Sequence, residues 1–161
     1  MNAELMTNLI NEIQRLHNRY ESFAGITPEF FDPGNMEFLD KVEGSYDEEK
    51  KNGFIRFEVK GTRYDGRTEL IETVHLGDPV KIVRDEKNAF NSNNFAVHTQ
   101  GGKDLGNLPA ELCNDIAPLY DSQILSINSA CISYVEHLSK RSRNAKQAML
   151  FVEMHFCIKE E

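Results

Sequence analysis

The first part of the chain carries apolar residues at intervals of three and four positions. Over residues 3–23 these are Leu5, Met6, Leu9, Ile10, Ile13, Leu16, Tyr20 and Phe23. This spacing places them on one stripe of an amphipathic helix, and Gly25 is a typical residue for its end. Apolar surface must cover the stripe, and either the rest of the chain or a second copy provides it. The pattern predicts an N-terminal helix and leaves intrachain packing and a homodimer both open.

The segment that follows is acidic and has only a weak apolar pattern. A Thr-Pro-Glu run at residues 27–29 indicates a helix start, and the Asp-Pro-Gly run at 32–34 stops that helix almost at once. Residues 35–49 are predicted to form a short helix and a loop. We therefore expect a helical, acidic extension over residues 1–52 and a separate domain over residues 53–161.

After Gly53 the apolar residues alternate or cluster as in β-strands. The strand-like runs are FIRFEV at 54–59, ELIETVHL at 69–76, PVKIV at 79–83 and FAVHT at 95–99. They are rich in β-branched and aromatic residues, which favour a pleated, partly buried surface. These runs predict a β region.

The last part of the chain combines one helix with two long strand-like runs. Residues 108–121 return to helical spacing, with Pro109 in the first turn and Pro118 at a place where it tightens the helix or ends it early. The runs at 123–138 and 147–158 are joined by a polar, basic connection, which is typical of a protruding β-hairpin. The predicted fold class is α+β, mainly β, with an N-terminal helical extension.

Composition and motifs restrict the possible functions. The 161 residues are 40% hydrophobic and 27% charged, and no apolar run approaches the roughly 20 residues that span a bilayer. No secretory signal is evident, so we expect a cytoplasmic protein without membrane attachment. The three cysteines and five histidines lack metal-ligand spacing, so no metal or cofactor is expected. Phosphate-binding, nucleophile-elbow and zinc-protease motifs are missing, and an enzyme is therefore not expected.

The charge distribution softens an argument against nucleic acid. The net charge is −8, which disfavours binding through the overall field. However, residues 1–59 contain six basic and twelve acidic residues, whereas residues 60–161 contain twelve and fourteen. Most of the excess acid therefore precedes the β region.

Two segments suit a binding surface. In KGTRYDGR at 60–67, Arg63 and Tyr64 place two flat side chains with hydrogen-bond donors side by side, which can stack a base and hold a phosphate; a plain surface turn is the alternative. The second segment is a loop longer than the two to five residues a hairpin needs. It surrounds Phe90 with Asn88, Asn91, Asn93 and Asn94. Asparagines also shape turns locally, so several of them would serve the loop itself.

In their order and spacing, these pieces resemble a HIRAN domain, a small module found alone in bacteria and at the front of helicase-like DNA-repair translocases. The matching stretches are GTRY at 61–64, GDPVKIVRDEKNAFNSNNFAV at 77–97, GGKDLGNLPAEL at 101–112 and the helix to Tyr120. The resemblance covers about residues 54–156. It implies a small β-barrel similar to an OB-fold, with added helices, and a pocket for the 3′-hydroxyl end of single-stranded DNA.

The resemblance also implies roles for individual residues. Arg63 and Tyr64 match the Arg and the aromatic residue that engage the terminal nucleotides, and Asn88 matches the loop Asn. Phe90 matches a base-stacking Tyr, and Asn93 matches the Asn that fixes the loop. Phe keeps the stacking face of Tyr and loses only a hydroxyl.

Besides Phe90, five positions depart from the family pattern. Asn91 stands where the family has an Asp that accepts a hydrogen bond from the terminal hydroxyl, and an amide does not repel a terminal phosphate as a carboxylate does. Asn107 and Ala110 fall where DNA-binding members place a His and a Lys. Ala89 replaces the loop Pro, and Asn94 replaces a small Ala. The resemblance thus implies a changed pocket.

The expected function is a non-catalytic module that binds single-stranded DNA or DNA 3′ ends in DNA repair or processing, with a helicase or nuclease as a possible partner. The candidate DNA-binding residues are Arg63, Tyr64, Asn88, Phe90, Asn91 and Asn107. Lys140, Arg141, Arg143 and Lys146 add basic contacts if the hairpin turn folds toward the pocket. The alternative is a protein-interaction or assembly domain that has lost DNA binding, and a metal-dependent nuclease ranks third.

Overall fold

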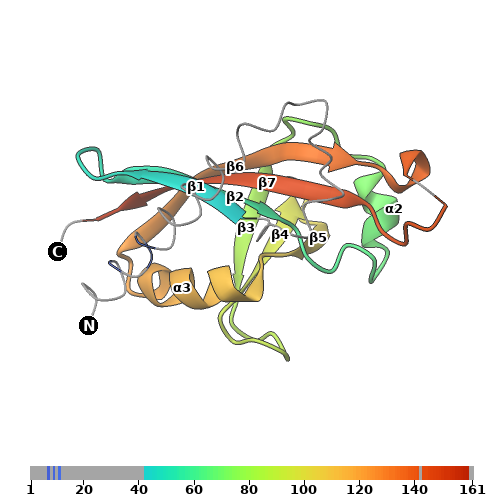
Figure 1. The fold of residues 1–161 in the computed structure, drawn as a ribbon. Helices are drawn as coiled ribbons and strands as arrows, with labels where there is room; N and C mark the ends of the chain where they lie inside the picture. The colour runs from blue at the N-terminus through green and yellow to red at the C-terminus, as the bar shows by residue number, and fades with distance from the viewer. Residues whose placement is uncertain (1–6, 8, 10, 12–41, 142, 160–161) are drawn as a thin grey trace.

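The strands form two antiparallel sheets (Figure 1), in a computed structural model that describes residues 7, 9, 11, 42–141 and 143–159. The first sheet has the order β1-β2-β7-β6, with β1 at Val42–Asp47, β2 at Asn52–Glu58, β6 at Leu125–Glu136 and β7 at Met149–Ile158. The second has the order β3-β4-β5, with β3 at Val80–Asp85, β4 at Asn94–Thr99 and β5 at Asp104–Asn107. The helices are α2 at Arg67–Ile71, α3 at Ala110–Asp121 and the 3₁₀ helix η2 at Leu138–Lys140. The α+β, mainly β fold class is confirmed.

The two sheets meet at isolated bridges and do not close into a hydrogen-bonded barrel within the described chain. One bridge joins Lys60 to Asn107, and the other joins Pro79 to Cys131. Proline has no backbone N–H, so a ladder cannot continue through Pro79. The expected OB-like closed barrel is therefore corrected to two sheets joined at their margins.

The core lies between the sheets and α3. Inward positions of β2 and β7 alternate along each strand, as the period of two requires, and Phe57, Val152, Met154 and Phe156 are each at most 1% exposed. Leu112, Ile116 and Leu119 supply the buried stripe of α3. Full burial of such a side chain contributes roughly 1.5–3 kcal/mol. The expected strands at 54–59, 79–83 and 95–99 are confirmed in β2, β3 and β4.

Strand β1 corrects the expectation of a short helix and loop where it falls on residues 42–49; its part at residues 35–41 lies outside the described residues. It pairs in register with β2, from Val42 opposite Phe57 to Asp47 opposite Asn52. Gly44 and Tyr46 are its buried positions, and glycine gives no apolar signal, so the alternation is hidden in the sequence. The boundary between residues 52 and 53 stays a prediction.

Helix α2 corrects the expectation of a strand at residues 69–76. The helix follows Gly66, whose φ of +74° is one that glycine adopts without strain. Thr68 and Ile71 are its buried residues, three positions apart as on one face of a helical turn, and residues 72–76 contain no strand. Short β-branched runs do not separate strand from helix, and here tertiary packing decided.

Two further expectations on the C-terminal part are modified. Pro118 lies inside α3, which continues to Asp121, so the proline does not end the helix early. Strands β6 and β7 pair as predicted, but as part of the four-stranded sheet, in which β7 lies between β2 and β6. The connection between β6 and β7 packs beside α2 (Figure 1), where the Glu72 carboxylate accepts hydrogen bonds from Ser139 N–H and Oγ, both at 3.0 Å.

Most of the expected N-terminal extension lies outside the described residues. Of it, Thr7, Leu9 and Asn11 are helical, and Leu9 is buried in the core cluster. The full extent of the helix and a homodimer through it stay predictions.

Candidate functional site

The loop between β3 and β4 carries an exposed aromatic ring, and hydrogen bonds within the loop hold its backbone. The Asn88 amide donates to the Asp85 carboxylate at 3.1 Å. Its oxygen accepts the backbone N–H groups of Phe90 at 2.9 Å and of Asn91 at 3.1 Å. Asn88 is therefore occupied in shaping the loop, and its expected role as a DNA contact stays a prediction. The side chain of Phe90 is left 99% exposed.

A second set of amides ties this loop to α3. The Asn91 oxygen accepts the backbone N–H of Asn93 at 2.9 Å. The side-chain amides of Asn91 and Asn93 both donate to the oxygen of Asn114, each at 3.2 Å. Sequence reasoning missed Asn114, because only the folded chain brings α3 beside the loop. Asn93 fixes the loop in the manner that the resemblance implied, whereas Asn91 is engaged on both sides of its amide.

Arg84 clamps the far side of the loop. Its guanidinium donates to the carbonyl oxygens of Ser92 at 2.7 Å and Asn94 at 3.1 Å. It also makes a bidentate pair with the Asp121 carboxylate at 3.0 and 2.9 Å, and lies 5.4 Å from the ring centroid of Phe95. The hydrogen bond from Arg84 lowers the pKa of Asp121, and the same contact raises the pKa of Arg84.

The lowered pKa of Asp121 predicts a pH effect. A carboxyl with a lower pKa in the folded state stabilises fully above its unfolded pKa and loses this contribution as the pH falls through the folded pKa. We expect Asp121→Asn to be less stable than the unmodified chain at neutral pH, and this deficit to shrink below about pH 4. Urea unfolding at pH 7 and at pH 3 measures it. A deficit of the same size at both pH values would contradict the ion-pair assignment.

Asn94 is the buried junction of the region. It is 6% exposed, and its amide donates to the carboxylate of Asp85 at 3.1 Å and to the side-chain oxygen of Asn107 at 3.0 Å. The Cys113 thiol lies 3.9 Å from its oxygen, and burial raises the pKa of this thiol to about 11, so it stays a donor. All polar groups of Asn94 are therefore engaged. Its hydrogen-bond partner Asn107 lies on the neighbouring strand, β5.

Asn107 connects this junction to the turn that carries Arg63 and Tyr64. Its backbone exchanges hydrogen bonds with Lys60 at 2.8 and 2.9 Å. This close approach requires glycine at position 106, because a Cβ there would lie 2.5 Å from the Lys60 oxygen. The side-chain oxygen of Asn107 is committed to Asn94, and a direct DNA contact by Asn107 stays a prediction.

The turn after β2 exposes the second aromatic ring. Arg67 donates to the Gly61 carbonyl at 3.0 Å and pairs with Asp104 at 2.8 Å, which holds the turn against β5. Tyr64 is 58% exposed, and the guanidinium carbon of Arg63 lies 5.4 Å from its ring centroid. The structure therefore gives the adjacent flat pair that the sequence predicted.

The loop that carries Phe90 and the turn that carries Tyr64 are connected by a hydrogen bond near their ends, and their tips point to different parts of the molecule. Asn94 closes the β3–β4 loop, Asn107 borders the turn, and the two side chains are hydrogen-bonded to each other. In Figure 1 the loop extends past α3, and the turn lies beside α2.

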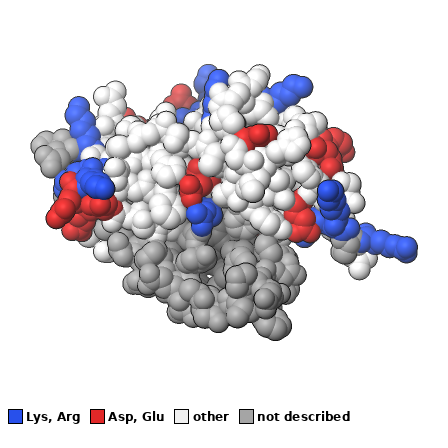
Figure 2. All heavy atoms as spheres, turned by 90° about the horizontal axis from the view of Figure 1, so that it is seen from above, with Lys and Arg blue, Asp and Glu red and all other residues white. Residues whose placement is uncertain are grey.

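The basic connection between β6 and β7 lies next to the Arg63–Tyr64 turn. Thr62, which precedes Arg63, donates through its hydroxyl to the carbonyl of Ala148 at 3.1 Å. Lys140, Arg143 and Lys146 are exposed, whereas Arg141 donates to the Gln147 carbonyl at 3.0 Å and lies 3.7 Å from Glu136. Basic and acidic side chains are interspersed over the face shown in Figure 2, which therefore has no large patch of positive charge. Electrostatic attraction of a phosphate on this face would come from individual basic side chains.

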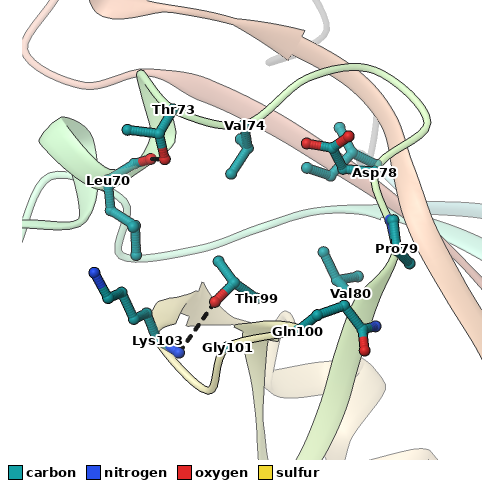
Figure 3. A pocket seen from close by; sticks show the side chains of 11 residues that line it. Leu70, Thr73, Val74, Asp78, Pro79, Val80, Thr99, Gln100, Gly101 and Lys103 are labelled. Carbon is teal, nitrogen blue, oxygen red and sulfur yellow. Dashed lines mark hydrogen bonds between the residues drawn. The ribbon is translucent and has the colours of Figure 1, made fainter.

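A separate pocket lies at the other end of β4 (Figure 3). Its volume is about 400 Å³, and Leu70, Val74, Val80 and Ile132 line its apolar part. Asp78 and Lys103 are its charged residues, and no aromatic residue lines it. None of the predicted site residues belongs to it.

Two other searches of the described residues bear on function. They contain no group of three or more His, Cys, Asp or Glu that could hold a metal ion. No helix among them is long and apolar enough to cross a membrane.

Comparison with known proteins identifies the family. A protein-family model described as the HIRAN domain matches residues 52–152. The chain belongs to the HIRAN family. The match covers strands β2 to β6 and the first part of β7, and it confirms the resemblance seen in the sequence.

Solved structures similar to this HIRAN chain include the crystal structure of the HIRAN domain of human HLTF, with 21% identity and a TM-score of 0.49 over 66% of this chain and 77% of that one. A protein from Lactobacillus plantarum has 19% identity and a TM-score of 0.49, over 62% of this chain and 90% of that one. The HLTF HIRAN domain in its DNA-bound conformation has 25% identity and a TM-score of 0.45, over 66% and 76%. No curated protein matches the chain.

Proposed function

We propose that this HIRAN chain is a non-catalytic module that binds single-stranded DNA, including its 3′ end, by stacking bases on Phe90 and Tyr64. The observation that carries the proposal is Phe90, which is 99% exposed at the tip of a loop held by its own amides. A large ring kept in water by a well-ordered loop gains favourable burial only from a partner. Bases fit this ring because each of them has a flat face for stacking.

The second aromatic residue, Tyr64, combines a stacking face with a neighbouring positive charge. Tyr64 presents its ring beside the Arg63 guanidinium, so a base on Tyr64 would have a cation within reach of its phosphate. Because the Phe90 loop and this turn share the Asn94–Asn107 contact, they are held in a defined relation. This arrangement supports contacts to more than one nucleotide of a strand.

Fluorescence anisotropy at low salt tests the proposal with short oligonucleotides that end in a 3′ hydroxyl or a 3′ phosphate, and with a duplex as control. We expect single strands to bind and the duplex to bind more weakly. The Asn91 amide is neutral and does not repel a phosphate, so both ends should bind with similar affinity. No binding of any single strand at low salt would refute the proposed function.

The basic connection predicts a salt effect. Arg143 and Lys146 are exposed near the Arg63–Tyr64 turn, and a strand that passes Tyr64 would place phosphates beside them. We expect the double substitution R143A/K146A to weaken binding and to flatten the dependence of log affinity on log salt by roughly 0.7 for each lost phosphate contact. Lys50→Ala is the matched control, because Lys50 lies in the β1–β2 turn at the opposite end of the molecule (Figure 1). Equal effects of the two changes would argue against contacts by this connection.

A repair or processing context, a helicase or nuclease partner and a cytoplasmic location belong to the same proposal. The alternative role in protein interaction or assembly rests on the amphipathic pattern of residues 3–23. Size-exclusion chromatography with and without these residues tests it. A monomer in both cases, together with DNA binding, would remove its main support.

A further inference from the structure

The orientation of three side-chain amides around Phe90 follows from a single backbone donor. The Asn93 N–H can only meet an oxygen, so the Asn91 side chain must turn its oxygen toward it, at 2.9 Å. The amino group of Asn91 then points to Asn114 and donates to the Asn114 oxygen at 3.2 Å. Asn93 donates to the same oxygen at 3.2 Å.

The Asn114 side chain can therefore donate hydrogen bonds to a ligand but cannot accept them. A carbonyl oxygen has two lone pairs, and the amides of Asn91 and Asn93 occupy both. The amino group of Asn114 carries two N–H donors, and the exposed side chain makes no hydrogen bond through them to the described residues. This distinguishes Asn114 from an ordinary exposed asparagine, which can use its oxygen and its amino group together.

These donors belong to the residue of α3 that contacts Asn91, the neighbour of Phe90 in the chain. Asn91 directly follows Phe90, and the backbone N–H groups of both residues meet on the oxygen of Asn88. Asn91 is also the residue that contacts Asn114. A base that stacks on Phe90 and turns its edge toward α3 would meet an amide that presents N–H groups alone.

We propose that Asn114 is a specificity-determining residue that favours keto bases, uracil, thymine and guanine, over the amino bases cytosine and adenine on Phe90. The inference rests on the proposed function, because it requires a base on that ring. Keto bases present the acceptors O4 or O6, whereas amino bases present N4–H or N6–H groups that would face the donors of Asn114. A free asparagine prefers adenine because it pairs with both N6–H and N7, and that mode is blocked when its oxygen is occupied.

Single strands of deoxyuridine and deoxycytidine, about twelve nucleotides long, give a matched test in mildly alkaline buffer. The two bases have the same ring size and differ only along one edge. We expect the unmodified chain to bind the uridine strand about fivefold more tightly, at the lower end of the range for a base contact because the position is exposed.

Asn114→Asp reverses the polarity at constant shape. One carboxylate oxygen still accepts from Asn91 and Asn93, while the other presents an acceptor to the base. We expect this variant to prefer the cytidine strand, and Asn114→Ala to bind both strands equally. Gln123→Glu, an exposed position just after α3, controls for the added negative charge and should keep the uridine preference.

The outcomes separate this inference from the proposed function. Equal binding of both strands by the unmodified chain, or a uridine preference that survives both Asn114 substitutions, would overturn the role of Asn114 and leave DNA binding intact. Binding of neither strand would overturn the proposed function itself. Circular dichroism verifies that each variant is folded, and Asn114→Ala still tests the proposal if Asn114→Asp does not fold.

Discussion

Phe90→Ala is expected to lower the affinity for single-stranded DNA about 5- to 150-fold, with almost no change in stability. The affinity range corresponds to the roughly 1–3 kcal/mol that a stacked base contributes. Stability should be unaffected because the ring is 99% exposed and makes no contribution to the core. Tyr64→Ala should have a similar effect, since the 58% exposed ring is the other stacking face. Anisotropy titrations and urea unfolding measure the two quantities on the same samples.

Two matched variants show whether stacking or general hydrophobicity is responsible. Phe90→Tyr keeps the flat face and should retain the affinity, whereas Phe90→Leu keeps an apolar side chain without that face and should lose most of it. Leu76→Ala removes another exposed apolar side chain, 68% exposed, outside the candidate site, and should not change binding. If Phe90→Ala and Leu76→Ala weaken binding to the same extent, Phe90 is not a stacking residue.

The strands that the sequence predicted well are those whose buried positions are mostly apolar. Strand β4 is buried over Asn94, Phe95, Ala96 and Val97, and it carries the apolar, β-branched character that the prediction used. Strand β1 escaped prediction because one of its buried positions is Gly44. Helix α2 escaped because a short run of β-branched residues fits a helical turn as well as a strand.

In the candidate site, local contacts could be predicted from the sequence and tertiary contacts could not. Interactions of a side chain with its own neighbours, such as the hydrogen bonds that the Asn88 oxygen accepts from the backbone of Phe90 and Asn91, follow from local chemistry and were foreseeable. Contacts that depend on tertiary proximity were not, and the contacts of Asn114 with Asn91 and of Arg84 with Asp121 are examples. Their partners lie on segments far away in the chain, and no local pattern marks such pairs.

The asparagines of the loop therefore have different tasks. Asn88 shapes the backbone around Phe90, and Asn91 and Asn93 attach the loop to α3. The buried Asn94 is hydrogen-bonded to the half-buried Asn107, and this contact lies between the loop and the turn. Two departures from the family pattern, at positions 94 and 107, are thus linked, because the Asn94 amide donates to the Asn107 side-chain oxygen.

Asn94→Ala is expected to destabilise the fold by roughly 1–3 kcal/mol, although it restores the small residue of the family pattern. The substitution removes the N–H donors to Asp85 and Asn107, and unsatisfied groups in a buried position carry this cost. It also cuts the link between the Phe90 loop and the Arg63–Tyr64 turn, so DNA affinity should fall as well. Urea unfolding and anisotropy check the two effects, with Gln100→Ala, an exposed position outside the candidate site, as a control.

A double-mutant cycle with Asn107→Ala decides between two roles for Asn107. If Asn107 serves mainly as the partner of Asn94, its replacement lowers stability, and the double variant loses less than the sum of the single losses by about 0.5–3 kcal/mol. If Asn107 instead contacts DNA directly, Asn107→Ala weakens binding without a matching loss of stability, and the stability effects add. Because its side-chain oxygen lies 3.0 Å from the Asn94 amide and its backbone is paired with Lys60, the first result is expected. The departure from the family at position 107 would then belong to the architecture of the site, and contact with the DNA strand would rest with Phe90, Tyr64 and Arg63.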